Sequence, residues 1–334
     1  MANNKIAYGL AKEYGIDTKG MSPKEVWEAL KEKGVSNEQA SYRQNTSYDE
    51  ISGKDEKEMP KVDKTAEKTS SNKIESQNLT PEEIKKLGDQ LQRGEYLEIE
   101  DLKNHPVVKY LARKSDEVNK KYGDTRFLPG REKKREQWKN EFLSMGSMQE
   151  QPDGRYKANG PIKREFKAVI VTGLPAAGKS SRMVNPISRD IGGFVFDNDE
   201  IKGLIDEFKE SKGAAAGAVH EESSDIQKEA LKEFLTGGKR QGDNLVIPKI
   251  GEDAGNLQRK LIDKLEEAGY DVEIQYNPAS LKDSMNRVVM RAIRTGRFIP
   301  LDIVEGYGDG PAKAYNEFKN KKNKKGNPYI KERK

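Results

Sequence analysis

The pattern of apolar and polar positions changes near residue 164, and the segment that follows carries the clearest structural signal. Residues 167–172 are a short apolar run rich in β-branched side chains, which is typical of a central strand in a parallel sheet. Similar short runs recur at 194–196, 245–247 and 272–276. Segments with helical spacing separate these runs, so the pattern predicts right-handed βαβ units and a doubly wound parallel sheet, an α/β fold.

Helices are expected between these strands and after the last one. The spacing of apolar residues predicts a helix from residue 179 and further helices over 201–208, 220–235, 257–268 and 280–295. The first half of the chain predicts helices without strands. Two short helices are expected within 5–34, and helical spacing returns at Thr80-Pro81-Glu82-Glu83, a capping box, and runs to about Met145.

Between these helical regions the chain is almost entirely polar. Residues 36–77 contain scarcely a large aliphatic side chain, and such a segment cannot offset its ordering entropy by apolar burial. Residues 151–155 are expected to form a turn or a second linker. The predicted organisation is a small helical module (1–35), a disordered linker (36–78), a helical extension packed on the catalytic domain (79–160), an α/β domain (161–318) and a solvated basic tail (319–334).

Composition narrows the classes of function. Hydrophobic residues make up 33% of the chain and charged residues 35%, so the folded part is expected to be shorter than the whole. The net charge of +5 is too slight for a nucleic-acid binder, so nucleic acid is not an expected partner. The absence of cysteine excludes disulfides, thiolate zinc sites and cysteine nucleophiles. No apolar run suits a signal peptide or a membrane span, which predicts a soluble cytoplasmic protein.

One motif carries specific chemistry. The pattern G-x-x-x-x-G-K-[ST] follows the first strand and opens a helix, as a phosphate-binding P-loop must. Its glycines let backbone N–H groups surround a phosphate, its lysine brings a cation to the β- and γ-phosphates, and its hydroxyl ligates Mg²⁺. ATP and Mg²⁺ are therefore the predicted cofactors, with Ser180 as the metal ligand. The nucleotide-binding residues are Gly173, Leu174, Pro175, Ala176, Ala177, Gly178, Lys179, Ser180 and Ser181.

A cluster of carboxylates follows the second strand. Asp197 and Asp199 stand at its C-terminal end, and open α/β sheets bind their ligands at that edge. A kinase needs a carboxylate there to accept the proton of the attacking hydroxyl or to hold Mg²⁺ through water. Capping of the next helix is an equally good reading of Asp199 from the residues alone.

These motifs together resemble the zeta toxins of bacterial toxin–antitoxin systems. The resemblance covers about 166–305 and rests on the P-loop, on 197–202, on 219–224 and on the arginine-containing segment 286–300. Members of that family use ATP and Mg²⁺ to phosphorylate the 3′-hydroxyl of UDP-N-acetylglucosamine. The resemblance implies an ATP-dependent kinase with a UDP-sugar substrate that acts as a toxin, with an antitoxin protein as a candidate partner.

The resemblance also implies roles for single residues. Asp199 would be the catalytic base, Lys179 the phosphate-binding lysine, and Arg287 and Arg297 the contacts to the transferred phosphate. Arg287, Arg291 and Arg294 share one helix face by their i, i+4, i+7 spacing, although a solvated basic face would show the same spacing. The candidate substrate-binding residues are Asp197, Glu221, Glu222 and Lys249, and the sequence leaves open which of the two glutamates faces the site.

Lys249 marks a departure from the family. The family has an acidic residue, a glycine and a threonine after the corresponding strand, whereas this chain has Pro248-Lys249-Ile250-Gly251. An ammonium group there favours an anionic acceptor group such as a diphosphate. A kinase of another acceptor, with a nucleotide or nucleic-acid hydroxyl, and a nucleotide-binding interaction protein with little turnover therefore remain as alternatives.

Overall fold

The computed structural model describes residues 79–128 and 130–331, together with Ile16, Met21, Glu25, Val26, Glu28 and Ala29. The chain divides into two units, Met1–Glu75 and Ser76–Lys334, and the fold described below belongs to the second. The predicted linker over 36–78 and nearly all of the predicted module over 1–35 lie outside the described residues. Those two predictions stay predictions.

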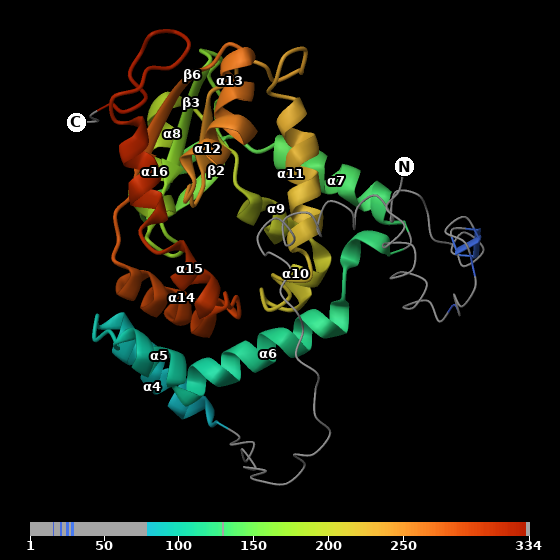
Figure 1. The fold of residues 1–334 in the computed structure, drawn as a ribbon, viewed down its shortest axis with the longest axis vertical. Coiled ribbons are helices and arrows are strands. Elements are labelled where there is room, and N and C mark those ends of the chain that lie inside the picture. The colour runs from blue at the N-terminus through green and yellow to red at the C-terminus, as the bar shows by residue number, and fades with distance from the viewer. Residues whose placement is uncertain are drawn as a thin grey trace. The chain divides into compact units, whose positions relative to one another are not determined.

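The second unit contains a six-stranded sheet, which lies in the upper part of that unit as Figure 1 draws it. Its strand order is β2-β1-β4-β5-β3-β6, and the four strands β3 to β6 run parallel to one another. The strands are β1 (Ser147–Glu150), β2 (Tyr156–Gly160), β3 (Lys167–Thr172), β4 (Phe194–Val195), β5 (Leu245–Pro248) and β6 (Asp271–Tyr276). The predicted α/β fold with a parallel core is confirmed.

The sheet is buried on both faces because β3 and its neighbours carry apolar side chains in both directions. Ala168 and Ile170 point into the larger core, whereas Val169 and Val171 point into a smaller core on the opposite face. Helices cover each face. The helices of this half are α8 (Asn185–Ile191), α9 (Asn198–Leu204), α10 (Asp206–Glu210), α11 (His220–Lys232), α12 (Ala254–Leu257), α13 (Asp263–Glu267), α14 (Leu281–Thr295), α15 (Leu301–Tyr307) and α16 (Gly310–Phe318), with π-helical turns at Ser180–Val184 and Gln258–Ile262.

The residues before the sheet fold as helices. They are α4 (Pro81–Gln92), α5 (Ile99–Asn104), α6 (Pro106–Tyr122), a 3-10 turn at Thr125–Phe127 and α7 (Arg131–Leu143). The predicted capping box of Thr80 and Glu83 is present at the start of α4. Leu87 and Leu91 of α4 pack with Met285 and Val289 of α14 in a second core, so α14 is covered by the extension (Figure 1).

Helix α7 makes a different contact. Its Trp138 and Phe142 are buried in the main core, where Phe142 meets the rings of Phe194 and Phe196 at centroid distances of 5.0 and 5.7 Å. Such aromatic clusters bury large areas. The helices before the sheet therefore supply parts of both cores.

Two features differ from the sequence expectation. Residues 151–155 are the turn of an antiparallel hairpin, β1–β2, which joins the sheet beside β4 and makes it mixed. The sequence concealed this hairpin because both strands are short and largely polar. In the basic tail the side chains of Lys319, Lys321, Lys322, Lys324 and Lys325 are exposed as expected, whereas Lys331 is half-buried and pairs with Asp271. The backbone of the tail is docked: Tyr329 is buried, and its carbonyl accepts a hydrogen bond from Ile274 N at 2.7 Å. None of the helices that the structure describes is long and apolar enough to cross a membrane.

We expect a fragment of residues 161–318 to lose cooperative folding. Removing α4 to α7 and β1–β2 exposes apolar surface on α14 and around Phe194, while a fragment of residues 79–331 keeps both cores closed. Thermal unfolding followed by circular dichroism measures the difference. A cooperative transition of 161–318 at the temperature of 79–331 would contradict this assignment of the two cores.

Candidate active site

The P-loop lies between β3 and the π-helical turn at Ser180–Val184. Its shape requires glycine at two positions. Gly173 has a φ of +144°, and a Cβ there would lie 2.6 Å from the carbonyl oxygen of Asn277. Gly178 has a φ of +87°. Left-handed backbone of this kind suits glycine, and glycine-rich loops of this kind bind phosphate groups through their backbone N–H groups.

Neighbouring elements hold this loop in place. The buried side chain of Asn277, after β6, donates a hydrogen bond from Nδ2 to the carbonyl of Ala177 at 2.8 Å. Ser284 of α14 donates from Oγ to the carbonyl of Pro175 at 2.6 Å. Because both contacts are buried, the loop is fixed to β6 and α14 rather than free to change shape.

Lys179 and Ser180 end the loop. Lys179 Nζ donates to the carbonyls of Gly173 and Leu174 at 2.6 and 2.9 Å, and burial lowers the pKa of Lys179 to about 8 while the charges of Asp197 and Asp199 raise it. Ser180 is exposed at the mouth of the loop. No group of three or more His, Cys, Asp or Glu side chains suited to a metal occurs among the described residues. Mg²⁺ in nucleotide sites takes one or two protein ligands besides phosphates and waters, so the Ser180 hydroxyl with an aspartate nearby still fits it.

The two aspartates differ in their surroundings. Asp197 caps α9, accepting a hydrogen bond from Asp199 N at 3.0 Å, and burial raises the pKa of Asp197 to about 6 with a further contribution from the Asp199 charge. Asp199 is held by Arg297, whose Nη1 and Nη2 donate to its two carboxylate oxygens at 2.5 and 2.7 Å. Burial opposes ionisation of Asp199, but this pairing outweighs it and the pKa of Asp199 is lowered.

The predicted arginines separate in the structure. Arg297 joins Asp199, whereas Arg287 donates from Nε to the Tyr96 hydroxyl at 3.0 Å and lies over the Tyr96 ring. Arg291, one turn further along α14, is the arginine whose charge acts on Lys179 and on both aspartates. The structure therefore brings Lys179, Asp197, Asp199 and Arg297 together, and it gives Arg287 a partner in the segment between α4 and α5.

Lys249 also reaches this site. It follows β5, its Nζ donates to Gln227 Oε1 of α11 at 3.4 Å, and burial lowers the pKa of Lys249 while the charge of Asp197 raises it.

Lys202 lies beside the same aspartates, and it was not identified as a site residue from the sequence. Its side chain is 7% exposed, its Nζ lies 4.0 Å from Asp199 Oδ1, and burial lowers its pKa to about 8. Its place three residues after Asp199 on α9 is a local signal that could have shown it.

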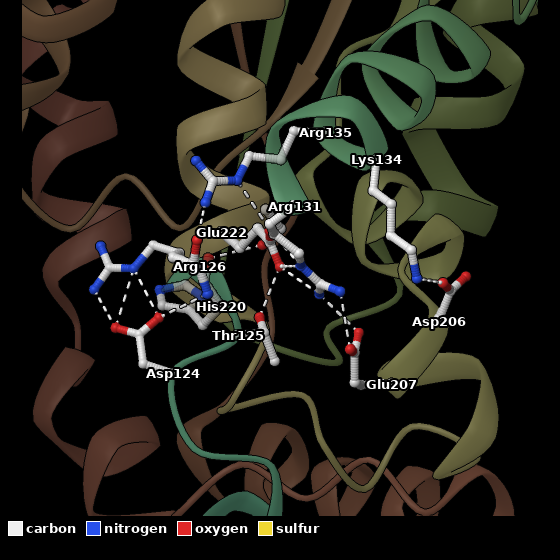
Figure 2. A network of polar contacts seen from close by, with 11 residues as sticks. Asp124, Thr125, Arg126, Arg131, Lys134, Arg135, Asp206, Glu207, His220 and Glu222 are labelled. Carbon is white, nitrogen blue, oxygen red and sulfur yellow. Dashed lines mark hydrogen bonds and ion pairs between the residues drawn. The ribbon is translucent and has the colours of Figure 1, made fainter. Parts of the chain in front are cut away.

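The two glutamates at the start of α11 face different surroundings. The side chain of Glu221 is half-exposed, and its Oε2 lies 3.9 Å from Nη1 of Arg126. Glu222 is fully buried and accepts hydrogen bonds from Thr125, Arg131 and Arg135 (Figure 2). A carboxylate enclosed in this way does not present itself to a substrate, so the structure separates Glu222 from the predicted substrate contacts.

The contacts of Glu222 belong to a larger buried network (Figure 2). The guanidinium of Arg131 binds Glu222 on one side, at 2.6 Å, and both carboxylate oxygens of Glu207 on the other, at 2.7 and 2.9 Å. It also stacks on the Trp138 ring at 4.7 Å. The network therefore ties α7 to α10 and α11, the helices that flank α9 and its aspartates. No local pattern shows it, since the partners are 76 and 91 residues apart.

A phosphate-binding loop at the end of a buried strand, with a carboxylate–arginine pair across the same edge, defines an α/β P-loop protein equipped for phosphoryl transfer. The family model described as zeta toxin matches residues 156–334, which is 179 of the 334 residues. The chain therefore belongs to the zeta toxin family, whose members are kinase-like phosphotransferases.

Other comparisons add little. No curated protein matches the chain. Among solved structures it is similar to one from the PezAT chromosomal toxin–antitoxin system of Streptococcus pneumoniae, with 17% identity, a TM-score of 0.28, and coverage of 35% of this chain and 48% of that one. The chain thus spans about half the length of that relative, and so slight a likeness supports no conclusion of its own.

We expect Arg131→Met to destabilise the protein strongly. The variant leaves the fully buried Glu222 carboxylate with fewer donors, which costs about 3–5 kcal/mol of the free energy of unfolding. Chemical denaturation measures this. Lys134→Met is the matched control, because the ion pair of Lys134 with Asp206 lies on the same helix but is exposed, and its loss should change stability little. Equal destabilisation by both variants would show that the buried network has no special weight.

Proposed function

We propose that this protein is an ATP-dependent kinase that phosphorylates a hydroxyl of a UDP-activated amino sugar, with UDP-N-acetylglucosamine as the leading acceptor, and that it acts as a toxin. The observation that carries the proposal is the meeting of Lys179 and the Asp199–Arg297 pair at one edge of the sheet. These are the groups that in-line transfer of a phosphoryl group needs: a cation on the phosphates, a proton acceptor and a guanidinium for the developing charge.

The proposed reaction follows from these positions. Asp199 takes the proton of the acceptor hydroxyl while that oxygen forms a bond to the γ-phosphorus, and the bond from the γ-phosphorus to the bridging oxygen breaks to leave ADP. Lys179 and Arg297 stabilise the charge on the phosphoryl oxygens. Mg²⁺ bound near Ser180 would neutralise charge on the β- and γ-phosphates.

Arg297 has to exchange partners for this reaction. Both of its Nη atoms are engaged by Asp199, and an Asp199 carboxylate so occupied cannot receive a proton readily. Arg297 follows Gly296, which has a φ of +71° and ends α14. When a phosphate competes for the guanidinium, Arg297 turns to it and frees Asp199, so binding of the nucleotide activates the base.

A second candidate is a kinase of another anionic acceptor, and Lys249 favours it. A buried ammonium beside Asp197 and Gln227 replaces the acidic character that the family resemblance leads one to expect there. We also propose an antitoxin protein as a partner, on the family assignment alone.

Incubation of the purified protein with Mg-ATP and a panel of UDP-sugars, nucleosides and oligonucleotides tests the function directly. We expect phosphorylation of UDP-N-acetylglucosamine above the other acceptors, and none with Lys179→Ala, which removes the cation from the transferring phosphates. Transfer only to a nucleoside or oligonucleotide would establish the second candidate. Absence of ATP turnover with every acceptor would leave a nucleotide-binding interaction protein.

The pH dependence of kcat/KM for ATP tests which aspartate is the base, because it reports the enzyme before the nucleotide binds, while Arg297 still pairs with Asp199. A base works when deprotonated, so the rate falls as pH drops through its pKa. Because Arg297 holds the pKa of Asp199 low, we expect the rate to stay level across pH 6, and Arg297→Met should move the acid limb to higher pH. A wild-type limb near pH 6 that disappears in Asp197→Asn would instead make Asp197 the base.

A further inference from the structure

A cavity of about 380 Å³ opens beside the catalytic carboxylate, between the turn after α10 and the end of α14. The described residues that line it include four cations, Lys209, Lys212, Arg291 and Arg297, and no carboxylate. Phe208 and two glycines supply apolar surface. The cavity shares Arg297 with the candidate active site, and its lining includes the two lysines but not Asp199.

The guanidinium groups of Arg291 and Arg297 in this cavity have N–H donors that are not used in hydrogen bonds within the described part of the chain. Nε and Nη2 of Arg291 and Nε of Arg297 are buried, and no described residue accepts a hydrogen bond from them. Burial and the neighbouring Arg297 charge lower the pKa of Arg291 to about 10, which shows the cost of holding the two cations together. Buried donors of this kind are normally satisfied, so the arrangement suits an anion that bridges them.

The wall of the cavity consists of closely packed backbone with positive φ angles. Gly213, with a φ of +89°, lies so close to the end of α14 that a Cβ would meet Thr295 O at 2.7 Å. Gly296 approaches from the other side, where a Cβ would meet Lys212 O at 2.6 Å. Between them Lys212 itself has a φ of +51°, a conformation that a side chain other than glycine or asparagine rarely adopts. This geometry holds the turn of Lys212 against the loop that carries Arg297, and strain of this kind gathers at binding sites.

We propose that this cavity is a second anion site that binds a phosphate or diphosphate group, separate from the P-loop. Arg291 and Arg297 form its floor and Lys209 and Lys212 its exposed rim. Planar guanidinium groups bind phosphate oxygens in pairs, and the lysines add charge at the entrance. Two sources supply the same chemistry: the diphosphate of the acceptor, or a free phosphate or pyrophosphate ion. The first source rests on the proposed function, whereas binding of pyrophosphate by itself does not.

Titration calorimetry with sodium pyrophosphate, on the full chain saturated with ADP at the P-loop, tests the site. We expect binding in the presence of ADP, and at least about tenfold weaker binding in Arg291→Met and in Lys212→Met, because each loses a charge-assisted contact. Arg291→Lys should restore part of the affinity. Arg294→Met is the matched control, since Arg294 is exposed on the same helix outside the cavity and should bind like the wild type.

The outcomes separate the alternatives. Unchanged pyrophosphate binding in Arg291→Met, an equal loss in Arg294→Met, or binding that vanishes with ADP present would each overturn the proposal. Melting temperatures of the variants show whether a loss reflects unfolding, and Lys212→Met, at the exposed rim, keeps the test open if Arg291→Met fails to fold. Competition between UDP and pyrophosphate, with a raised acceptor KM and an unchanged ATP KM in Lys212→Met, would identify the acceptor as the source. Pyrophosphate binding that UDP does not displace would identify the free ion. A kinase assay that fails while pyrophosphate still binds would refute the proposed function alone.

Discussion

The arrangement of the active site depends on one buried contact, the guanidinium of Arg131 between Glu222 and Glu207. An ionised carboxylate with no exposure to water is tolerated only when its charge is paired and its lone pairs are filled. Glu222 meets this demand with donors from two segments of the helical extension, Thr125 and α7. Since Glu222 belongs to α11 and Glu207 to α10, the pairing fixes where these helices stand around α9, and so where Asp197 and Asp199 stand. The extension is therefore part of the same folded unit as the P-loop and the two aspartates, and not an addition to it.

Arg131, Arg291 and Arg297 differ in whether their buried N–H donors have acceptors within the protein. The N–H edges of the Arg131 guanidinium are occupied by the carboxylates of Glu207 and Glu222, and its plane lies over the Trp138 ring, so Arg131 is a structural part of the fold. Arg291 and Arg297 are also largely buried, but they keep buried N–H donors that no residue in the described part of the chain accepts from. In a structural ion pair the donors all have protein acceptors, whereas groups that bind a ligand often have donors that no protein atom accepts from. By this criterion the buried donors of Arg291 and Arg297 at the end of α14 are suited to a ligand, which supports the anion site proposed above.

Sequence patterns predicted the parts of the site that are local in the chain. The P-loop could be read because two glycines, a lysine and a serine stand at fixed spacing after an apolar strand, and Asp197 and Asp199 because they follow the next strand. The choice between Glu221 and Glu222 could also have been made: Glu222, Ile226 and Ala230 are four residues apart, so Glu222 lies on the stripe that packs into the core. The pairing of Arg131 with Glu222 could not, because it joins residues 91 positions apart and leaves no periodic trace. The β1–β2 hairpin was not predicted for another reason: the strand from Ser147 to Glu150 is too short and too polar to show the alternation of apolar and polar residues that marks a strand.

The docked C-terminal segment has a consequence for the behaviour of the protein at high concentration. Strand β6 is the last strand of the sheet on its side, and an open edge of a parallel core offers unpaired N–H and C=O groups to any other chain. The carbonyls of Tyr329 and Lys331 engage this strand, accepting from Ile274 N at 2.7 Å and from the Gln275 side chain at 2.8 Å. Tyr329 holds this C-terminal segment in place, because its ring packs on Phe318 and its hydroxyl donates a hydrogen bond to Glu266. The exposed lysines around this anchor add like charge to the same border. The segment thus guards the sheet against edge-to-edge self-association.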